Sequence, residues 1–308
     1  MKRRWLATLA LAAPLLSACV TQSGSPLPEG TLAQGLAAGI TAPNTPPPGS
    51  NIAGCTPSSA HPYPVVLVHA TMINMDFNWQ ALSPMLYNAG YCVYAFNYGA
   101  TPSGLGIFDG LGDIATSAQQ LATEVNSVLA TTGASQVDIV GHSQGGMMPR
   151  YYIQDLGGAS KVHELVGIAP SNYGTTLDGL ASLANALGGL GFNVNSLVSS
   201  LGGPALTEQE QGSAFLTALN ANGDTVPGVK YVVIESDHDE VVTPYTNAFL
   251  KGPGAQNILV QDQCPSDPVG HIGMVYDQTV LDDVMNALGT DSPTYQPPCN
   301  SSGFGVPV

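Results

Sequence analysis

The stretch Val-Asp-Ile-Val-Gly-His-Ser-Gln-Gly-Gly, residues 137–146, decides the fold of this 308-residue chain. Residues 137–140 are rich in β-branched apolar side chains, as in a buried strand, and an apolar segment with helical spacing follows residue 146. Between them, Gly141-His142-Ser143-Gln144-Gly145 fits the pattern G-x-S-x-G. In a strand–turn–helix context the pattern indicates a nucleophile elbow, whose flanking glycines leave room for a serine at the tip. We therefore predict that Ser143 is a catalytic nucleophile; a chance match among 36 glycines is the alternative.

Short apolar runs alternate with helical patterns along the rest of the chain. We expect strands at 65–68, 91–96, 161–169, 231–235 and 257–260, and helices at 79–89, 113–132 and 272–288. This alternation is typical of an α/β domain with a doubly wound, mostly parallel sheet. Residues 172–220 include an apolar stretch that is poor in charge and rich in glycine. We expect a lid or cap insertion there, either mobile or packed shut.

The first 18 residues have the features of an export signal. Three basic residues precede an apolar run that is too short to span a bilayer comfortably. Leu16-Ser17-Ala18-Cys19 resembles a lipobox, which predicts lipidation of Cys19 and anchoring to the cell envelope; an ordinary secretory signal is the alternative. Residues 19–60 are rich in proline, glycine, serine and threonine, so we predict a flexible tether that leads to a catalytic domain at 61–308.

The charge balance limits the partners of this protein. Beyond residue 18 the chain keeps 22 acidic and four basic residues, a formal charge of −18. Such a surface repels nucleic acid, so we exclude a nucleic-acid partner. We expect a monomer whose membrane contact is the lipid anchor at Cys19.

Four cysteines remain beyond Cys19, namely Cys55, Cys92, Cys264 and Cys299. An even number in an exported chain predicts two disulfides, and four cysteines allow three pairings. We favour Cys55–Cys92 and Cys264–Cys299, which would staple the two ends of the domain separately. The chain has no zinc-site spacing, so we expect no metal.

A serine nucleophile needs a base within hydrogen-bond reach and an acid that orients the base. Where serine follows an elbow strand, the acid and then the histidine come later in the chain. His271 stands in a loop before the last predicted helix and is our candidate for the base. His163 falls in a predicted strand before any acid loop, and His238 lies in an acidic cluster, so neither fits as well.

The acid is expected in the loop after the strand at 231–235. Asp239 is favoured because an apolar run resumes at Val241 and would fix the loop against the sheet. Asp237 is the alternative, and an acidic loop without a catalytic member is the remaining one. Two backbone N–H groups must also stabilise the oxyanion. We assign them to Gln144, which follows the nucleophile, and to Thr71, in the turn after the first strand.

Taken together, these motifs resemble the class 2 triacylglycerol lipases of secreted, actinobacterial type. The resemblance covers residues 55–300 and rests on these stretches: His61-Pro62 before Val65-Val66-Leu67-Val68-His69, Gly90-Tyr91-Cys92-Val93, Asn97-Tyr98-Gly99, Gly141-His142-Ser143-Gln144-Gly145-Gly146-Met147-Met148-Pro149-Arg150, Ala169-Pro170-Ser171-Asn172 with Gly174-Thr175-Thr176, Asp239-Glu240-Val241-Val242-Thr243-Pro244-Tyr245, and Gly270-His271-Ile272-Gly273. It implies an α/β-hydrolase fold, the triad Ser143, Asp239 and His271, the cysteine pairing above, and ester hydrolysis without metal or cofactor.

One position departs from the family pattern. Ala70 stands where the family has glycine after the histidine of the first strand, and its β-carbon could shift the Thr71 amide. The resemblance to the family therefore implies less about substrate preference than about the triad. We expect a lipase or esterase; a short-chain carboxylesterase or polyester hydrolase, an acyltransferase and an acyl-binding lipoprotein without catalysis are the alternatives.

Overall fold

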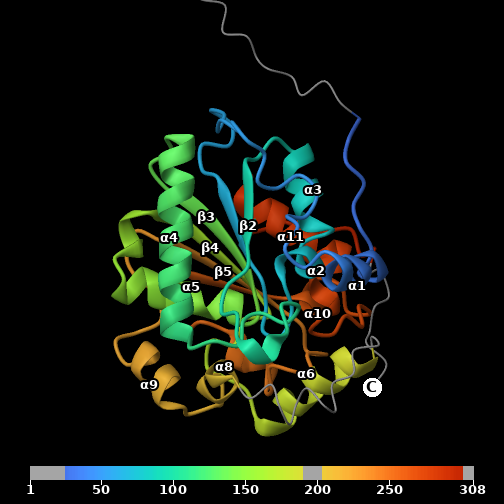
Figure 1. The fold of residues 1–308 in the computed structure, drawn as a ribbon, viewed down its shortest axis with the longest axis vertical. Helices are drawn as coiled ribbons and strands as arrows, with labels where there is room; N and C mark the ends of the chain where they lie inside the picture. The colour runs from blue at the N-terminus through green and yellow to red at the C-terminus, as the bar shows by residue number, and fades with distance from the viewer. Residues whose placement is uncertain (1–24, 190–202, 301–308) are drawn as a thin grey trace, which may run out of the picture.

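The computed structural model describes residues 25–189 and 203–300, which form a three-layered α/β fold (Figure 1). Its sheet has six strands in the order β2-β1-β3-β4-β5-β6, and all neighbours are parallel. The strands are β1 (Val65–Val68), β2 (Val93–Phe96), β3 (Val137–His142), β4 (Val162–Ile168), β5 (Lys230–Glu235) and β6 (Ala255–Leu259). The doubly wound parallel sheet predicted from the sequence is confirmed.

Helices cover both faces of the sheet. They are α1 (Leu32–Thr41), α2 (Met75–Asn78), α3 (Leu82–Asn88), α4 (Ile114–Thr132), α5 (Gln144–Asp155), α6 (Leu177–Gly189), α8 (Pro204–Glu208), α9 (Ala214–Asn220), α10 (Val260–Gln263) and α11 (Gln278–Leu288), with 3-10 turns η1 (Pro102–Gly104), η2 (Gly158–Ser160), η3 (Tyr245–Ala248) and η4 (Gly273–Tyr276). Strand β1 shows how the two cores arise. Val65 and Leu67 pack with α3 and α11, whereas Val66 and Val68 pack with α4 and α5. The side chains of one strand thus serve both layers, because successive residues point to opposite faces.

Local signals placed α4 correctly. Asp113 caps its start by accepting the N–H of Thr116 at 2.7 Å, and Gly133 ends it with a left-handed φ of 72°. Two other predicted helices differ from the structure. The helix expected at 79–89 is the shorter α3, which begins only at Leu82, and the one expected at 272–288 is η4 followed by α11. The break between η4 and α11 lies at Asp277, whose side chain caps α11 through the N–H of Thr279.

The tether predicted for residues 19–60 is wrong for its described part, because residues from 25 onward lie against the domain (Figure 1). Helix α1 starts with a capping box, in which the Thr31 side chain accepts the N–H of Gln34 and the Gln34 side chain accepts the N–H of Thr31. Its buried residues are Leu32, Gly35 and Gly39. A β-carbon on Gly39 would lie 2.7 Å from Phe77 Cβ, so the absence of a side chain lets α1 approach α2 closely.

Other sequence predictions concern segments outside the described residues. The export signal, Cys19 and part of the insertion, residues 190–202, fall there. The described parts of the insertion are α6, α8 and α9, which Figure 1 shows together at one end of the sheet. Within residues 25–189 and 203–300, no helix has the length and apolar character needed to cross a membrane.

The predicted disulfide pairing is confirmed. Cys55 is bonded to Cys92 at the start of the domain, and Cys264 to Cys299 at its end. The two bridges close loops of 37 and 35 residues. By the chain-entropy argument, each loop is worth about 4 kcal/mol of stability.

Candidate active site

Ser143 lies between β3 and α5 at a sharp turn. Its φ of 56° and ψ of −121° are unusual for a residue with a side chain, and such strain is typical of a functional turn. The turn needs glycine on both sides. A β-carbon on Gly141 would lie 1.8 Å from the carbonyl oxygen of Gly145, and one on Gly145 would lie 2.1 Å from that of Val68. The G-x-S-x-G pattern therefore has the close-packed geometry that the sequence predicted.

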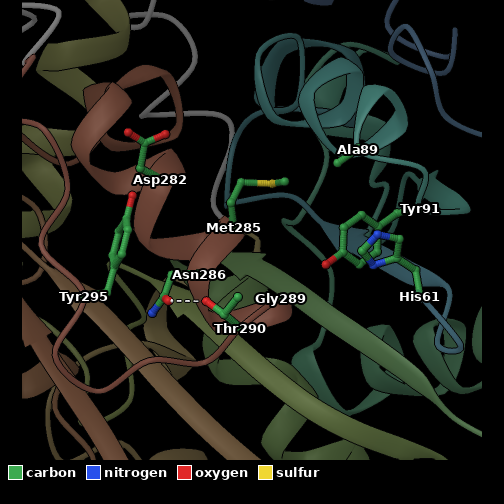
Figure 2. A pocket seen from close by; sticks show the side chains of 9 residues that line it. All are labelled: His61, Ala89, Tyr91, Asp282, Met285, Asn286, Gly289, Thr290 and Tyr295. Carbon is green, nitrogen blue, oxygen red and sulfur yellow. Dashed lines mark hydrogen bonds between the residues drawn. The ribbon is translucent and has the colours of Figure 1, made fainter.

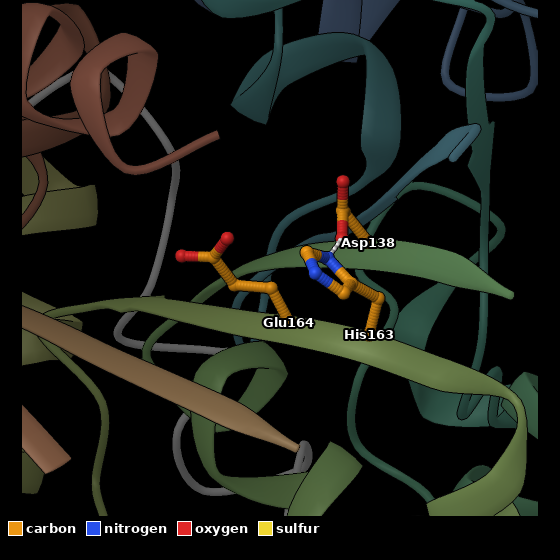
Figure 3. A group of neighbouring side chains, drawn as sticks. All are labelled: Asp138, His163 and Glu164. Atoms are coloured by element: carbon orange, nitrogen blue, oxygen red, sulfur yellow. Dashed lines mark hydrogen bonds and ion pairs between the residues drawn. The ribbon is translucent and has the colours of Figure 1, made fainter. Parts of the chain in front are cut away.

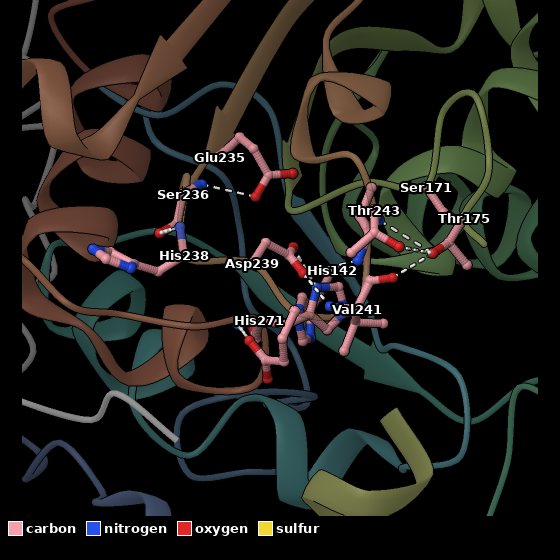
Figure 4. A network of polar contacts seen from close by, with 12 residues as sticks. His142, Ser171, Thr175, Glu235, Ser236, His238, Asp239, Val241, Thr243 and His271 are labelled. Atoms are coloured by element: carbon pink, nitrogen blue, oxygen red, sulfur yellow. Dashed lines mark hydrogen bonds and ion pairs between the residues drawn. The ribbon is translucent and has the colours of Figure 1, made fainter. Parts of the chain in front are cut away.

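Asp239 and His271, 32 residues apart in the chain, meet at the carboxyl end of the sheet (Figure 4). His271 Nδ1 lies 2.7 Å from Asp239 Oδ2, and both side chains are buried. The other carboxylate oxygen, Oδ1, accepts the N–H groups of Val241 and Val242 at 2.7 and 2.8 Å. The loop after β5 therefore clamps the carboxylate in one orientation, and Nδ1 of the imidazole carries a proton toward it.

The environment of His271 favours a base. Burial alone would lower its pKa, but the nearby negative charges of Asp239 and Glu240 outweigh burial and raise the pKa above 6.5. Its Nε2 atom is buried and has no hydrogen-bond partner among the described residues. Ser143 Oγ forms no hydrogen bond within that set either. The predicted nucleophile and the predicted base therefore both lack a hydrogen-bond partner among the described residues, and Ser143 is only 3% exposed.

His142 connects the elbow to the loop that carries His271. Its Nε2 donates to the carbonyl oxygen of His271 at 3.1 Å, since a carbonyl can only accept. Its Nδ1 lies 3.0 Å from Asn78 Oδ1, which also accepts the N–H of Ala70. Burial, followed by the charge of His271, holds the pKa of His142 well below its ordinary value. The residue before the serine thus positions the histidine loop and the turn after β1.

Thr71 and Gln144, the two predicted oxyanion donors, are adjacent. Gln144 Nε2 donates to Thr71 Oγ1 at 2.9 Å, and Gln209 Nε2 donates to the same oxygen at 2.9 Å. Among the described acceptors, none receives the backbone N–H of Thr71 or of Gln144. Ala70, the departure from the family pattern, is buried and donates its N–H to Asn78, so its β-carbon is accommodated. Gln209 comes from the insertion, and no sequence signal pointed to it.

The rejected candidates lie elsewhere. His238 and Asp237 face each other at 3.7 Å on the surface, with side chains 55% and 40% exposed. His163 Nδ1 lies 2.8 Å from Asp138 Oδ1, next to Glu164, near the strand ends opposite the elbow (Figure 3). The Lys230 ammonium is 2.9 Å from Glu164 Oε1, so each charge in that group has a partner. These contacts make it a structural ion-pair network.

A pocket of about 270 Å³ lies between the end of α3 and α11 (Figure 2). Its lining residues include His61 and Tyr91, whose ring centres are 3.8 Å apart, and Asp282 and Tyr295. None of its lining residues belongs to the group around Ser143. The predicted nucleophile and base therefore lie in the buried centre at the elbow and not in this pocket.

Known proteins share these features. Residues 62–282 match the sequence model of the family described as "Lipase (class 2)". A triacylglycerol lipase of Pseudarthrobacter phenanthrenivorans is 37% identical over 94 residues, covering 29% of this chain and 27% of that protein. A triacylglycerol lipase of Vibrio cholerae is 32% identical over 176 residues, covering 52% and 51%. The matched part of the chain thus spans about half or less of the length of these relatives.

The fold is also found among solved structures. The crystal structure of Aspergillus fumigatus lipase B superposes with a TM-score of 0.59 at 19% identity, over 93% of this chain and 68% of that one. At this identity the likeness concerns the fold alone. With the six-stranded parallel sheet and the elbow after β3, it makes the fold an α/β-hydrolase.

Proposed function

The chain belongs to the class 2 lipase family, and from that premise we propose that it hydrolyses carboxylic esters with Ser143, His271 and Asp239 as a catalytic triad. The observation that carries this proposal is the buried 2.7 Å contact between His271 and Asp239 at the end of the sheet that bears the Ser143 elbow. The three residues occur in the order serine, acid, histidine, as the fold requires.

In the proposed reaction, Ser143 Oγ attacks the ester carbonyl while His271 Nε2 takes its proton. Asp239 holds the Nδ1 proton and stabilises the imidazolium that forms. The proton then passes from Nε2 to the leaving alcohol, and an acyl-enzyme remains. Water, deprotonated by His271, attacks the acyl-enzyme and releases the carboxylic acid and Ser143.

The oxyanion of each tetrahedral intermediate would be held by the backbone N–H groups of Thr71 and Gln144. Both groups are unused by described acceptors, and the side chains of Gln144 and Gln209 fix Thr71 in place. Fixed donors of this kind lower the barrier because they need no reorganisation as charge develops. Loss of one would lower kcat on the order of 10²–10³-fold.

Labelling with a fluorophosphonate tests whether the triad is active. We expect one label per chain on Ser143, and none on Ser143→Ala. The same variant should lose ester hydrolysis by on the order of 10⁴-fold or more in kcat. A folded wild-type protein that takes no label would instead support an acyl-binding protein without catalysis. Comparing the products formed with and without added glycerol would reveal acyl transfer to alcohols.

Triacylglycerols are the proposed substrates, because both curated relatives are named triacylglycerol lipases. A chain-length series of esters, measured with and without an oil–water interface, tests this choice. Preference for long acyl chains at the interface supports a lipase whose insertion, residues 172–220, acts as a lid. Activity confined to short soluble esters would make the protein a carboxylesterase, and activity on insoluble polyesters a polyester hydrolase.

We also propose that the protein is exported and anchored by a lipid on Cys19. The two disulfides support an oxidising compartment, since paired cysteines are rare in reducing ones. Metabolic labelling with a fatty-acid analogue tests the anchor. Incorporation into the wild type but not into Cys19→Ala is expected, and equal labelling or none at all in both would contradict it.

A further inference from the structure

Glu235 is a fully buried carboxyl group at the end of β5, beside the proposed catalytic acid (Figure 4). Its Oε1 accepts the N–H of Ser236 at 2.7 Å. Its Oε2 is also buried and receives no N–H or O–H donor from the described part of the chain. Desolvation without a donor is costly for a charged oxygen, so this atom needs a different partner.

The carboxyl group of Asp239 is our candidate for that partner. A turn closed by the N–H of Asp239 and the carbonyl of Ser236, 3.1 Å apart, folds Asp239 back toward the end of β5. There the negative charge of Asp239 is close enough to help raise the pKa of Glu235. Two ionised carboxylates are both acceptors and cannot bond to each other, so a hydrogen bond between these two side chains requires that one of them hold a proton.

The contacts decide which of the two holds it. Asp239 already accepts the backbone N–H groups of Val241 and Val242 and the Nδ1 proton of His271. These three donors serve both oxygens of Asp239. Glu235 has a single donor, from Ser236, on its other oxygen. We infer that Glu235 is a carboxylic acid in the working protein and donates the proton on Oε2 to Asp239, as a positioning residue for the triad. This inference rests on the proposed function.

The electrostatic surroundings agree with this arrangement. Burial, and then the negative charges of Asp239 and Glu240, raise the pKa of Glu235 well above its ordinary value. With Glu235 protonated, the pair carries one negative charge and not two. A second charge would repel Asp239 from its place and hold the proton on His271 more tightly. Protonated Glu235 therefore orients Asp239 and leaves His271 available as a base.

Infrared difference spectra of the folded protein test the proton directly. At pH 8.5 the acids Glu164 and Asp283, whose pKa values are raised to about 7, are largely ionised. We expect the carboxylic-acid C=O stretch of the wild type to be missing from Glu235→Gln and to remain in the matched variant Glu164→Gln. A Glu235→Gln spectrum that loses no acid band would overturn the inference. This readout needs no catalytic activity, so it stands apart from the test of the triad.

The pH dependence of hydrolysis of a soluble ester tests the consequence. Gln at position 235 can still donate to Asp239 and accept from Ser236, but it cannot lose a proton. The wild type should lose kcat/KM on the alkaline side where its acid band disappears, and Glu235→Gln should not. Glu235→Leu, which has no donor, should lower kcat about tenfold with little change in KM. Identical alkaline limbs in the wild type and Glu235→Gln would contradict the role. A wild type without Ser143-dependent hydrolysis would instead refute the proposed function.

Discussion

The backbone N–H of His271 donates to Glu240 Oε2 across 3.1 Å, so two successive acidic residues hold the same histidine. Asp239 binds its ring and Glu240 binds its main chain. A β-carbon at position 270 would lie 2.5 Å from the same Glu240 oxygen, so a larger residue there would displace the Glu240 side chain. The loop after β5 and the loop before η4 are thereby fixed to each other.

Glu240→Gln should move the acid limb of the pH–activity profile to lower pH. His271 must be neutral to act as a base, so activity rises with pH through its pKa, which burial lowers but Asp239 and Glu240 raise above 6.5 overall. Glutamine keeps an acceptor for the His271 N–H but removes one negative charge, so the pKa should fall. The measurement is kcat/KM against pH, with the exposed Glu29→Gln as control. An acid limb at the same pH in the variant and the wild type would show that the charge of Glu240 does not affect the pKa of His271.

Gly141→Ala should destroy the elbow. The new β-carbon would meet the carbonyl oxygen of Gly145 at 1.8 Å, and backbone on both sides cannot move without displacing β3 or α5. We expect a loss of about 3 kcal/mol or more in unfolding free energy and no labelling by fluorophosphonate. Gly189→Ala is the matched control, since a β-carbon there meets no described residue within 4 Å. Urea denaturation of both variants gives the comparison, and equal stabilities would refute the close-packing argument.

Most of the fold and the main residues of the candidate site could be predicted because their signals are local. The elbow needs glycine at two positions around one serine, and α4 is marked by Asp113 at its start and Gly133 at its end. Asp239 and His271 could be chosen because the fold needs the acid and then the histidine after Ser143, the acid in a loop after a strand and the histidine in the loop before the last helix. These inferences use residues within a few positions of one another, or the order of elements along the chain.

Tertiary contacts set the rest, and those could not be predicted. The composition of residues 19–60 suggested a flexible chain, but α1 gains its stability by packing glycine against Phe77. The capping box at Thr31 and Gln34 was a local signal for this helix that composition obscured. Gln209 contacts Thr71, which is 138 residues away in the chain. The proposed pairing of Glu235 with Asp239 depends on the burial of both side chains. No sequence pattern around these four residues specifies such contacts.

Gly39→Ala should loosen α1. Alanine favours a helix over glycine by about 1 kcal/mol, but the β-carbon 2.7 Å from Phe77 Cβ forces the helix away at about 1–3 kcal/mol. The cost of the clash should exceed the gain in helix propensity. Limited proteolysis should therefore cut the variant before residue 43 faster than it cuts the wild type. The exposed Ala37→Ser, on the same helix, should leave the rate nearly unchanged. Equal cleavage of the Gly39 variant and the wild type would show that α1 does not need this close contact.

Asp283→Asn should stabilise the protein in neutral and alkaline solution but not in acid. Asp283 is 1% exposed on α11, and burial raises its pKa from 3.8 to about 7 despite the hydrogen bond from Gln263 Nε2 at 3.1 Å. Below pH 3.8 the Asp283 carboxyl is protonated in both the folded and the unfolded state, so its burial does not lower the unfolding free energy through ionisation. Between about 4 and 7 the unfolded chain loses the proton and the folded one keeps it, so stability falls as pH rises through this window and stays low above it.

Asparagine has the same shape and never ionises, so its advantage over Asp283 should grow with pH. We expect nearly equal Tm values near the lower end of that window and a gain on the order of 2–4 kcal/mol in unfolding free energy above its upper end. Thermal and urea unfolding across the pH range measure both, with the exposed Asp155→Asn as control. A gain that is the same at every pH would mean that Asp283 does not ionise between the two limits, and that the raised pKa is not what limits stability there.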